Sequence, residues 1–283
     1  MGYITIDGRA VSQSIKDEIR LEVKNLEPSI PILAVIMVGD DKGSEAYLRG
    51  LQKPCEYVGI NLLSYQLPVD ATESELIELI DKLNISRDIN GILLYVPLPS
   101  HIDKNKIMTI IDKNKDVDCF TPHNLGFLSV QNESTFRPCT PLGILALLDH
   151  YNIDLEGKCC VIVGRNNTVG KPLAYMLLSK NATVTICHSY TKNLSSITSC
   201  ADVLIVAIGK AKFITEDMVK DDAVVIDVGI NVDENGKLCG DVDFEHVKDK
   251  TSYITPVPGG VGPMTTAMVL KNCLSAYKIQ NER

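Results

Sequence analysis

Short apolar runs of strand length alternate with segments of helical period along the first half of this chain. Thr72 and Glu75 form a possible capping box at the start of one of these helical segments. The alternation favours a mostly parallel sheet with helices on both faces. The strands that we predict here span residues 32–39, 61–68 and 91–99, and the helices span residues 11–26, 44–60, 73–84 and 104–112.

A second alternating series occupies the rest of the chain. It opens with a helix of about three turns within residues 137–153, whose start is flanked by Pro138 and Pro141. Another helix begins at about Val169, and a loop rich in proline and glycine precedes a C-terminal helix. We therefore predict a domain boundary near residue 140. The strands of this series are expected at residues 159–164, 183–188, 203–209 and 223–230.

One predicted helix contains two residues that disfavour a regular helix. In the stretch SEAYLRGLQKPCEYVGI (residues 44–60), Tyr47 and Leu51 fall roughly on one face. Pro54 lacks the amide that would bond to the Gly50 carbonyl, and it therefore favours a kink. The stretch is either a kinked surface helix or the wall of an active site.

Composition places the chain among ordinary globular proteins. Its 283 residues exceed what one compact core usually takes, so two domains are expected. Hydrophobic residues make up 45% and charged residues 23% of the sequence, which is the usual balance. The formal net charge of −8 argues against a general nucleic-acid binder, although local positive charge can still bind small anions.

The cysteines, histidines and apolar runs argue against a disulfide-linked, secreted, membrane or metal-binding protein. The nine cysteines are an odd number without C-x-x-C pairs, and Cys159 and Cys160 lie in an apolar run, so we expect reduced thiols in a cytoplasmic protein. We expect no signal peptide, since the start MGYITIDGRA lacks a basic region followed by an apolar stretch, and no membrane span, since no apolar run approaches roughly 18 residues. The five histidines lack ligand spacing, so we predict no protein-bound metal.

The segment CCVIVGRNNTVGKPLAYMLL has the order strand, glycine turn and helix. Its turn from Gly164 to Gly170 lacks the G-x-G-x-x-G fingerprint of dinucleotide-binding folds. Even so, Gly164 permits a sharp turn, and Gly170 allows the start of the helix near Val169 to approach a ligand. The first amides of the helix would then face a pyrophosphate. The alternative is a tight turn that binds nothing.

The next strand favours NADP over NAD. It ends at His188 and Ser189, without the acidic residue that NAD-binding folds place against the ribose 2′-hydroxyl. A cation at Arg165 and the hydroxyl of Ser189 suit a 2′-phosphate, unless Arg165 is only a solvated loop cation. Farther on, Asp227 interrupts the apolar run VVIDVGIN, where it either serves a ligand or hydrogen-bonds its own loop. Ile230 is a candidate contact of the nicotinamide.

Eight segments of this chain follow a common order. They read DVDCFTPHNLG, RPCTPLGI, VGRNNTVGKPLA, CHSYTKNL, ADVLIVAIGK, VIDVGIN, GDVDFE and YITPVPGGVGPMT. Together they resemble the methylenetetrahydrofolate dehydrogenase/cyclohydrolase family of the FolD type. The similarity covers essentially the whole chain, and TPVPGGVGPMT is its most specific block.

The resemblance implies a fold and a reaction. The fold is α/β with two domains and a cleft between them. An N-terminal catalytic domain (residues 1–139) is completed by the C-terminal helix (residues 263–283), and residues 140–262 form a Rossmann-like NADP-binding domain with a parallel sheet. NADP takes a hydride from 5,10-methylenetetrahydrofolate, and a cyclohydrolase step then yields 10-formyltetrahydrofolate. The resemblance also implies a homodimer.

The resemblance further implies site residues at the positions that match the family's motifs. Tyr47 matches the active-site tyrosine, and Asp118 matches the aspartate that holds the pterin. Asn166 stands where the family has serine, and its amide can still donate to a phosphate. The folate-contacting loop matches Pro256, Gly259, Gly260 and Pro263, and the NADP contacts match Gly164, Arg165, Ser189 and Ile230.

Two positions depart severely from the family pattern. The family's catalytic lysine falls at Leu51, and the glutamine that supports it falls at Tyr95. Hydride transfer needs alignment of the substrate with the nicotinamide, whereas hydrolysis needs proton transfer. We therefore expect a dehydrogenase with little or no cyclohydrolase activity, unless a kink at Pro54 brings Lys53 into the site.

Other functions stay open. One is a fully bifunctional enzyme that uses another general base. A second is a catalytically silent protein that binds NADP or folate, against which the complete folate loop argues. An unrelated two-domain dehydrogenase of the shikimate or amino-acid type would share the architecture but would not explain the segment PVPGGVGP.

Overall fold

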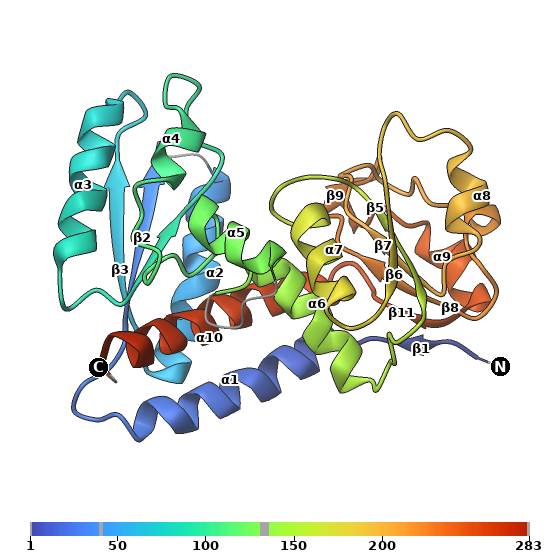
Figure 1. The fold of residues 1–283 in the computed structure, drawn as a ribbon, viewed down its shortest axis with the longest axis horizontal. Helices are drawn as coiled ribbons and strands as arrows, with labels where there is room; N and C mark the ends of the chain where they lie inside the picture. Colours follow the sequence, from blue (N-terminus) through green and yellow to red (C-terminus); the bar gives the residue numbers. More distant parts are fainter. Residues whose placement is uncertain (1, 40–41, 131–135, 282–283) are drawn as a thin grey trace. The chain divides into compact units, whose positions relative to one another are not determined.

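The computed structural model describes residues 2–39, 42–130 and 136–281, with their side chains except those of residues 42–45. The chain forms two compact units, most of whose elements are labelled in Figure 1. Each unit has its own parallel sheet and its own core. Unit 1 comprises Met1–Ser12 and Thr140–Thr265, and unit 2 comprises Gln13–Cys139 and Thr266–Arg283.

Unit 2 is built on a three-stranded parallel sheet in the order β3-β2-β4. β2 (Ile32–Val38) lies between β3 (Asn61–Leu67) and β4 (Gly91–Leu94). Its unbroken apolar run is buried along nearly its whole length, as expected for a central strand with both faces covered. Ile36 of this strand belongs to the same core cluster as Leu76 of the following helix.

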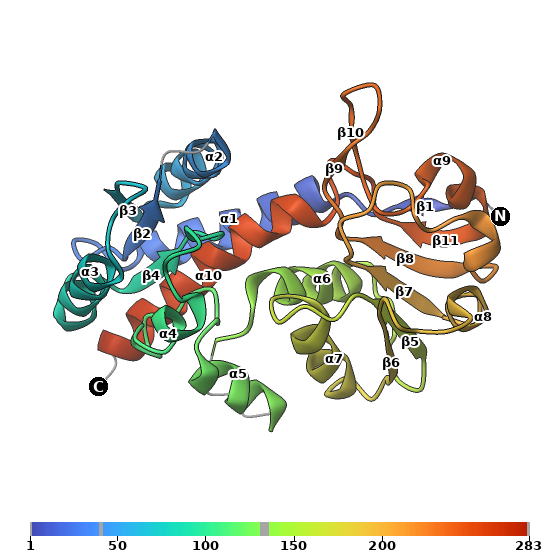
Figure 2. The ribbon, with the colours of Figure 1, turned by 90° about the horizontal axis from the view of Figure 1, so that it is seen from above.

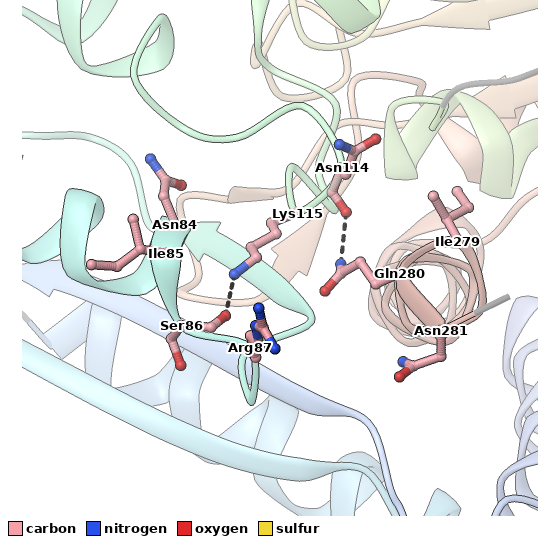
Figure 3. A pocket seen from close by; sticks show the side chains of 9 residues that line it. All are labelled: Asn84, Ile85, Ser86, Arg87, Asn114, Lys115, Ile279, Gln280 and Asn281. Atoms are coloured by element: carbon pink, nitrogen blue, oxygen red, sulfur yellow. Dashed lines mark hydrogen bonds between the residues drawn. The ribbon is translucent and has the colours of Figure 1, made fainter. Parts of the chain in front are cut away.

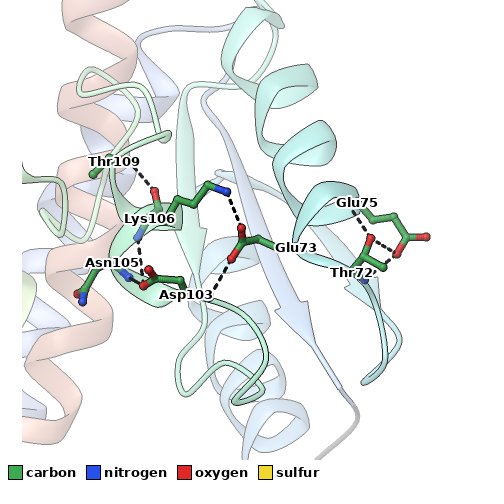
Figure 4. Close-up of polar contacts among 7 residues, drawn as sticks. All are labelled: Thr72, Glu73, Glu75, Asp103, Asn105, Lys106 and Thr109. Carbon is green, nitrogen blue, oxygen red and sulfur yellow. Dashed lines mark hydrogen bonds and ion pairs between the residues drawn. The ribbon is translucent and has the colours of Figure 1, made fainter.

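The predicted capping box is confirmed at the start of α3 (Glu73–Ile85). Thr72 Oγ1 accepts from the Glu75 amide, and the Glu75 carboxylate accepts from the Thr72 amide at 2.7 Å (Figure 4). In the same view, the Glu73 carboxylate pairs with Lys106 Nζ at 2.6 Å, which ties α3 to the short helix α4 (Lys104–Met108). The other helices that lie largely in unit 2 are α1 (Gly8–Lys24), α2 (Lys42–Val58), α5 (Pro122–Ser129) and α10 (Val261–Asn281).

The C-terminal part of α10 completes unit 2 through side-chain hydrogen bonds. Buried Asn272 donates from Nδ2 to the carbonyls of Val117 at 2.7 Å and Arg137 at 3.0 Å. Gln280 donates to the carbonyl of Asn114 at 3.0 Å. A helix from the end of the chain therefore holds loops from its middle in place.

A polar cavity of about 400 Å³ lies beside Gln280 (Figure 3). Buried Lys115 lines this cavity and donates from Nζ to the carbonyls of Leu83 at 2.8 Å and Ser86 at 2.5 Å. Burial lowers the pKa of Lys115. Because the two carbonyls lie at the C-terminal end of α3, the amine caps that helix and has a structural role.

Unit 1 has a six-stranded sheet in the order β1-β11-β8-β7-β5-β6, in which every neighbouring pair is parallel (Figure 2). Its central strands, β7 and β8, are fully buried. The strands are β1 (Ile4–Thr5), β5 (Cys159–Val163), β6 (Thr183–Cys187), β7 (Val203–Val206), β8 (Ala223–Asp227) and β11 (Thr251–Ile254). Around them lie α6 (Cys139–His150), α7 (Gly170–Leu178), α8 (Leu194–Thr198), α9 (Phe244–Val247) and the hairpin of β9 (Asn231–Val232) and β10 (Leu238–Cys239).

The third predicted strand, residues 91–99, is shorter than expected, since β4 ends at Leu94. One further bond runs from the Tyr95 amide to the Ile36 carbonyl at 2.9 Å. Beyond it, Pro97 and Pro99 have no amide to offer a sheet, so the ladder stops.

Residues 1–12 lie in a different unit from the one that we predicted. We assigned them to the first domain, within residues 1–139. In the structure β1 pairs in parallel with β11, and the Ile6 amide donates to the Ile254 carbonyl at 2.8 Å. These bonds make the start of the chain part of unit 1.

Three further observations concern the thiols, the length of the helices and the grouping of possible metal ligands. All nine cysteines carry free thiols. Within the described residues, no helix combines the length and the apolar character needed to cross a bilayer. In that same part of the chain, no group of three or more His, Cys, Asp or Glu side chains is arranged to hold a metal ion.

Candidate functional site

The positions singled out in residues 44–60 lie on α2, which runs through Pro54 to Val58 as one helix. Leu51 is 1% exposed, and Cys55, one turn further on, is equally buried, so this face packs into the core of unit 2. Lys53 is exposed. The proline therefore does not turn Lys53 onto the buried face that Leu51 occupies.

Tyr47 and Tyr95 lie against each other within unit 2. The half-buried ring of Tyr47, from α2, and the ring of Tyr95, which follows β4, have centroids 5.2 Å apart and planes inclined at 44°. Burial raises the pKa of Tyr47 above its usual value, and the negative charge of Asp118 raises it further. At neutral pH the Tyr47 hydroxyl is therefore protonated, and it can donate a hydrogen bond but cannot act as a base.

Asp118 is a carboxyl group that titrates near neutral pH. It is half-buried in the loop that precedes α5. Burial raises its pKa to about 7, and the nearby charge of Asp116 adds to this shift, while hydrogen bonding to Cys139 and the charge of Lys104 oppose it. A side chain with a pKa in this range can both bind and release a proton under physiological conditions.

The segment that carries Asp118 is fixed by a neighbouring aspartate that the sequence pattern did not single out. The Asp116 carboxylate is 2% exposed and accepts from the amides of Phe120 at 3.0 Å and Thr121 at 2.9 Å. Asn124 Nδ2 donates to the same carboxylate at 2.9 Å. The doubled aspartate of the segment KDVD is the sequence signal that could have indicated it.

In unit 1, the glycine turn that we predicted connects β5 to α7. A Cβ at Gly164, which has a φ of +132°, would lie 2.4 Å from the Ala207 carbonyl oxygen. A Cβ at Gly170 would lie 2.2 Å from the Gly164 carbonyl oxygen. Both glycines are therefore required by the packing of the turn against β7 and against itself, and this packing sets the close approach of strand and helix.

The first amides of α7 are bonded within the turn. Asn166 Oδ1 accepts from the amides of Val169 at 2.6 Å and Gly170 at 3.2 Å, and the Asn166 carbonyl accepts from Lys171 at 3.1 Å. We expected these amides to face a pyrophosphate, but Asn166 is their acceptor. The turn still offers an anion the Asn166 Nδ2 group and the positive end of the helix dipole.

Arg165, His188 and Ser189 follow neighbouring strands of the unit 1 sheet. Because β5 and β6 are parallel neighbours, the segments after them open on the same edge. Arg165 and Ser189 are exposed, and His188 is half-buried. Tyr190, which the sequence pattern did not single out, places its ring centroid 5.6 Å from Arg165 Cζ. A guanidinium beside a hydroxyl is a donor set that fits a 2′-phosphate.

Asp227 hydrogen-bonds its own loop, which is one of the two roles that we considered for it. At the end of β8 its carboxylate accepts from the amides of Gly229, Asp241 and Val242 at 2.8–3.0 Å. Burial raises its pKa to about 6, although these hydrogen bonds favour the charged form.

A second buried carboxylate, Asp241, holds the loop that follows β7. It accepts from the amides of Ile208, Gly209 and Lys210 at 2.7–3.0 Å, and from Asn231 Nδ2 at 2.9 Å. Its sequence signal is the pair Gly240-Asp241 in GDVDFE. A Cβ at Gly240 would collide with the Asp227 carboxylate, so the residue before Asp241 has to be glycine. The carboxyl edge of the sheet is thus shaped by two aspartates and their amides.

Ile230 and the loop rich in proline and glycine line one cavity of about 160 Å³ in unit 1. Arg9 of α1 also lines it. A Cβ at Gly8 would lie 1.8 Å from the Gly260 carbonyl oxygen, so the start of α1 packs directly on this loop. The structure therefore brings the nicotinamide candidate together with the candidate folate loop, of which Pro256, Gly259, Gly260 and Pro263 line the cavity.

Known protein families match both parts of the chain. Residues 6–118 match the catalytic domain of the tetrahydrofolate dehydrogenase/cyclohydrolase family, and residues 138–281 match its NAD(P)-binding domain. The bifunctional protein FolD of Agathobacter rectalis is 54% identical over 275 residues, which are 96% of this chain and 98% of that protein.

Solved structures show the same similarity. The bifunctional enzyme FolD from Campylobacter jejuni, a methylenetetrahydrofolate dehydrogenase/cyclohydrolase, is 49% identical with a TM-score of 0.96, and the match covers 98% of this chain and 99% of that one. The methylenetetrahydrofolate dehydrogenase-cyclohydrolase of Trypanosoma brucei, solved with NADP and an inhibitor, is 35% identical with a TM-score of 0.94, over 99% and 98% of the two chains. The two-domain α/β fold that we predicted is thereby confirmed.

Proposed function

The chain belongs to the tetrahydrofolate dehydrogenase/cyclohydrolase family, and from this premise we propose that it oxidises 5,10-methylenetetrahydrofolate with NADP and has lost most or all cyclohydrolase activity. The observation that carries the proposal is the buried leucine at position 51, where the family resemblance expects the catalytic lysine. Tyr95, which packs against Tyr47, stands where that resemblance expects the supporting glutamine.

Oxidation needs little proton chemistry from the protein. The nitrogen lone pairs of the substrate expel the hydride, and NADP, when bound, supplies the nicotinamide carbon that accepts it. The protein has to hold the two reactants in line. For NADP we propose Arg165, Ser189 and Asn166 as polar contacts and Ile230 as the apolar contact. For the folate we propose Tyr47, Asp118 and the loop from Pro256 to Pro263.

Hydrolysis of the methenyl product asks for more. Water has to lose a proton as it attacks, and a ring nitrogen has to gain one as the ring opens. Leucine can do neither, and the raised pKa of Tyr47 removes that hydroxyl as a base. Loss of general acid–base assistance typically costs about 10²–10⁴ in rate.

Separate assays of the two half-reactions test this proposal. We expect NADP reduction on addition of methylenetetrahydrofolate, and hydrolysis of methenyltetrahydrofolate close to the uncatalysed rate. Lys53→Ala should leave both rates unchanged. Hydrolysis well above the uncatalysed rate that disappears in Lys53→Ala would contradict the proposal and would assign the lost lysine's role to Lys53.

A fully bifunctional enzyme is the second candidate, and the pKa of Asp118 favours it. A carboxyl group with a pKa of about 7 lies in the best range for a general base at neutral pH. The similar FolD proteins are also described as bifunctional. In this case hydrolysis would be fast, and Asp118→Asn would lower its kcat more than it raised the KM for the folate.

A silent binding protein is the third candidate, and it predicts no NADP reduction in the first assay. We also propose that the protein acts in one-carbon metabolism as a cytoplasmic homodimer, on the family resemblance alone. Light scattering of the purified protein tests the dimer, since a single mass near 31.0 kDa would exclude it.

A further inference from the structure

We propose that Tyr190 is a positioning residue that orients Arg165 toward the 2′-phosphate of NADP and so contributes to discrimination against NAD. This inference rests on the proposed use of NADP and adds a residue that the family resemblance does not assign. Its starting point is the ring of Tyr190, which lies 5.6 Å from the Arg165 guanidinium although 79% of the tyrosine is exposed.

The backbone beneath Tyr190 is held in a closed turn. The His188 amide donates to Thr191 Oγ1 at 2.8 Å, and the Thr191 amide donates back to the His188 carbonyl at 2.8 Å. Between them, the Tyr190 amide donates to His188 Nδ1 at 3.2 Å. These bonds fix the point and the direction in which the tyrosine side chain leaves the backbone.

Such a ring can order an exposed arginine. Arg165 lies in the turn after β5, where its long side chain is free to adopt many rotamers, and this freedom opposes binding of an anion. A guanidinium is attracted to the face of an aromatic ring. Stacking leaves its N–H groups available for a bidentate contact with phosphate. The tyrosine thus lowers the entropic cost of that contact without touching the phosphate.

The same turn selects one tautomer of the neutral His188 ring. Because Nδ1 accepts the Tyr190 amide, the ring proton of the neutral imidazole is on Nε2, which is then a second donor. The His188 and Tyr190 rings lie 6.2 Å apart at 67°, so the histidine, the tyrosine and the arginine form a continuous row. We infer that this row faces the 2′-phosphate, which is the group that distinguishes NADP from NAD.

Isothermal titration calorimetry of the full chain with NADP and with NAD tests the proposal. We expect Tyr190→Ala to weaken NADP binding two- to fivefold, or about 0.4–1 kcal/mol at 1.4 kcal/mol per tenfold, and to leave NAD binding unchanged. Tyr190→Phe should keep the wild-type affinity, because the ring and not the hydroxyl faces the guanidinium. Tyr175→Ala, at another exposed tyrosine of unit 1, is the matched control and should change neither affinity.

A double-mutant cycle with Arg165 identifies the route of the effect. In an Arg165→Ala background, Tyr190→Ala should have no further effect on NADP affinity. An equal loss for both cofactors would overturn the proposal, because the ring would then contact a part that NADP and NAD share. A loss that persists without Arg165 would overturn it as well. If the unaltered protein binds NAD as tightly as NADP, the proposed cofactor itself is wrong.

Discussion

On the function proposed above, the leucine at position 51 changes the chemistry of α2 more than its shape. The helix still runs through Pro54, and the face that carries Leu51 and Cys55 is sealed in the core of unit 2. Tyr95, the second position of that proposal, places its ring beside the ring of Tyr47. On this proposal, apolar and aromatic packing at the two positions takes the place of groups that could support proton transfer.

Restoring both positions should return hydrolysis. In Leu51→Lys with Tyr95→Gln, we expect hydrolysis of methenyltetrahydrofolate to rise by about 10², at the low end of what acid–base catalysis provides, with hydride transfer within about twofold of wild type. Leu51→Lys alone should lower the free energy of unfolding by about 1–3 kcal/mol, since it buries an amine without a partner. Gln52→Lys adds the same charge at an exposed neighbour and is the control. No gain in hydrolysis by the double variant would contradict the assigned roles.

Asp118 should make the stability of unit 2 depend on pH. Its folded pKa of about 7 exceeds the usual 3.8, so the folded state binds the proton more tightly. This contribution to stability is fully present below pH 3.8 and is lost as the pH rises to about 7. Asp118→Asn removes the titration.

Thermal unfolding at pH 5 and pH 8 measures this effect. Because the carboxyl group is half-buried, we expect the variant to gain about 1–2 kcal/mol relative to wild type between the two pH values. Asp88→Asn, at an exposed carboxylate, should show no such gain. A difference between Asp118→Asn and wild type that is the same at both pH values would rule out this role.

At the scale of elements, the carboxyl edge of the unit 1 sheet depends on side chains that act as backbone acceptors. Asp227 and Asp241 together accept six backbone amide hydrogens from three loop segments. The loops after β7 and β8 carry no secondary structure of their own for most of their length. The two carboxylates therefore accept backbone amides that would otherwise bond within a helix or a sheet.

Asp241→Asn should therefore destabilise unit 1. An amide has one acceptor oxygen where the carboxylate has two, and its NH₂ group would face donors. We expect a loss of about 2–4 kcal/mol in the free energy of unfolding, as for a buried charged acceptor with several partners. Urea denaturation followed by circular dichroism measures it, with Asp243→Asn as the control, because that carboxylate binds an exposed histidine. Equal midpoints for the two variants would be inconsistent with this role.

Sequence patterns identified the buried strands better than the two-residue strands and the side chains that hold loops or neighbouring groups in place. β2, β5, β7 and β8 are nearly continuous apolar runs, and burial of both faces is what such a run indicates. β1, β9 and β10 have two residues each, too few for any period, and they depend on pairing with distant strands. The roles of Asp116, Asp241 and Tyr190 follow from neighbours that only the folded chain supplies.

At the scale of the whole molecule, neither unit is a continuous piece of chain. Unit 2 takes residues 266–283 from the far end of the sequence, and unit 1 takes residues 1–12 from its start. Most side chains from Ala267 to Tyr277 are buried. Asn272 and Gln280 also close loops around Val117 and Asn114.

A chain that ends at Thr265 should lose unit 2 but keep unit 1. The deletion removes the buried face of α10 and leaves the carbonyls of Val117 and Arg137 without the Asn272 amide. Hydrogen exchange should show unprotected amides in β2 and α3, while β7 and β8 stay protected. Protection in β2 that matches the full chain would contradict the role given to α10.

The interleaving of the two units also governs the order in which the protein can mature on the ribosome. Domains usually fold one after another as they emerge, the first before the second. Here residues 13–139 leave the ribosome early, yet they wait for Asn272 and Gln280, which are translated after the last residue of unit 1. Most of unit 1 is translated after residues 13–139. All of its residues are nevertheless present once Thr265 has been translated, so unit 1 is the first that can be complete. The unit that carries Tyr47, Leu51 and Asp118 is thus completed only after unit 1.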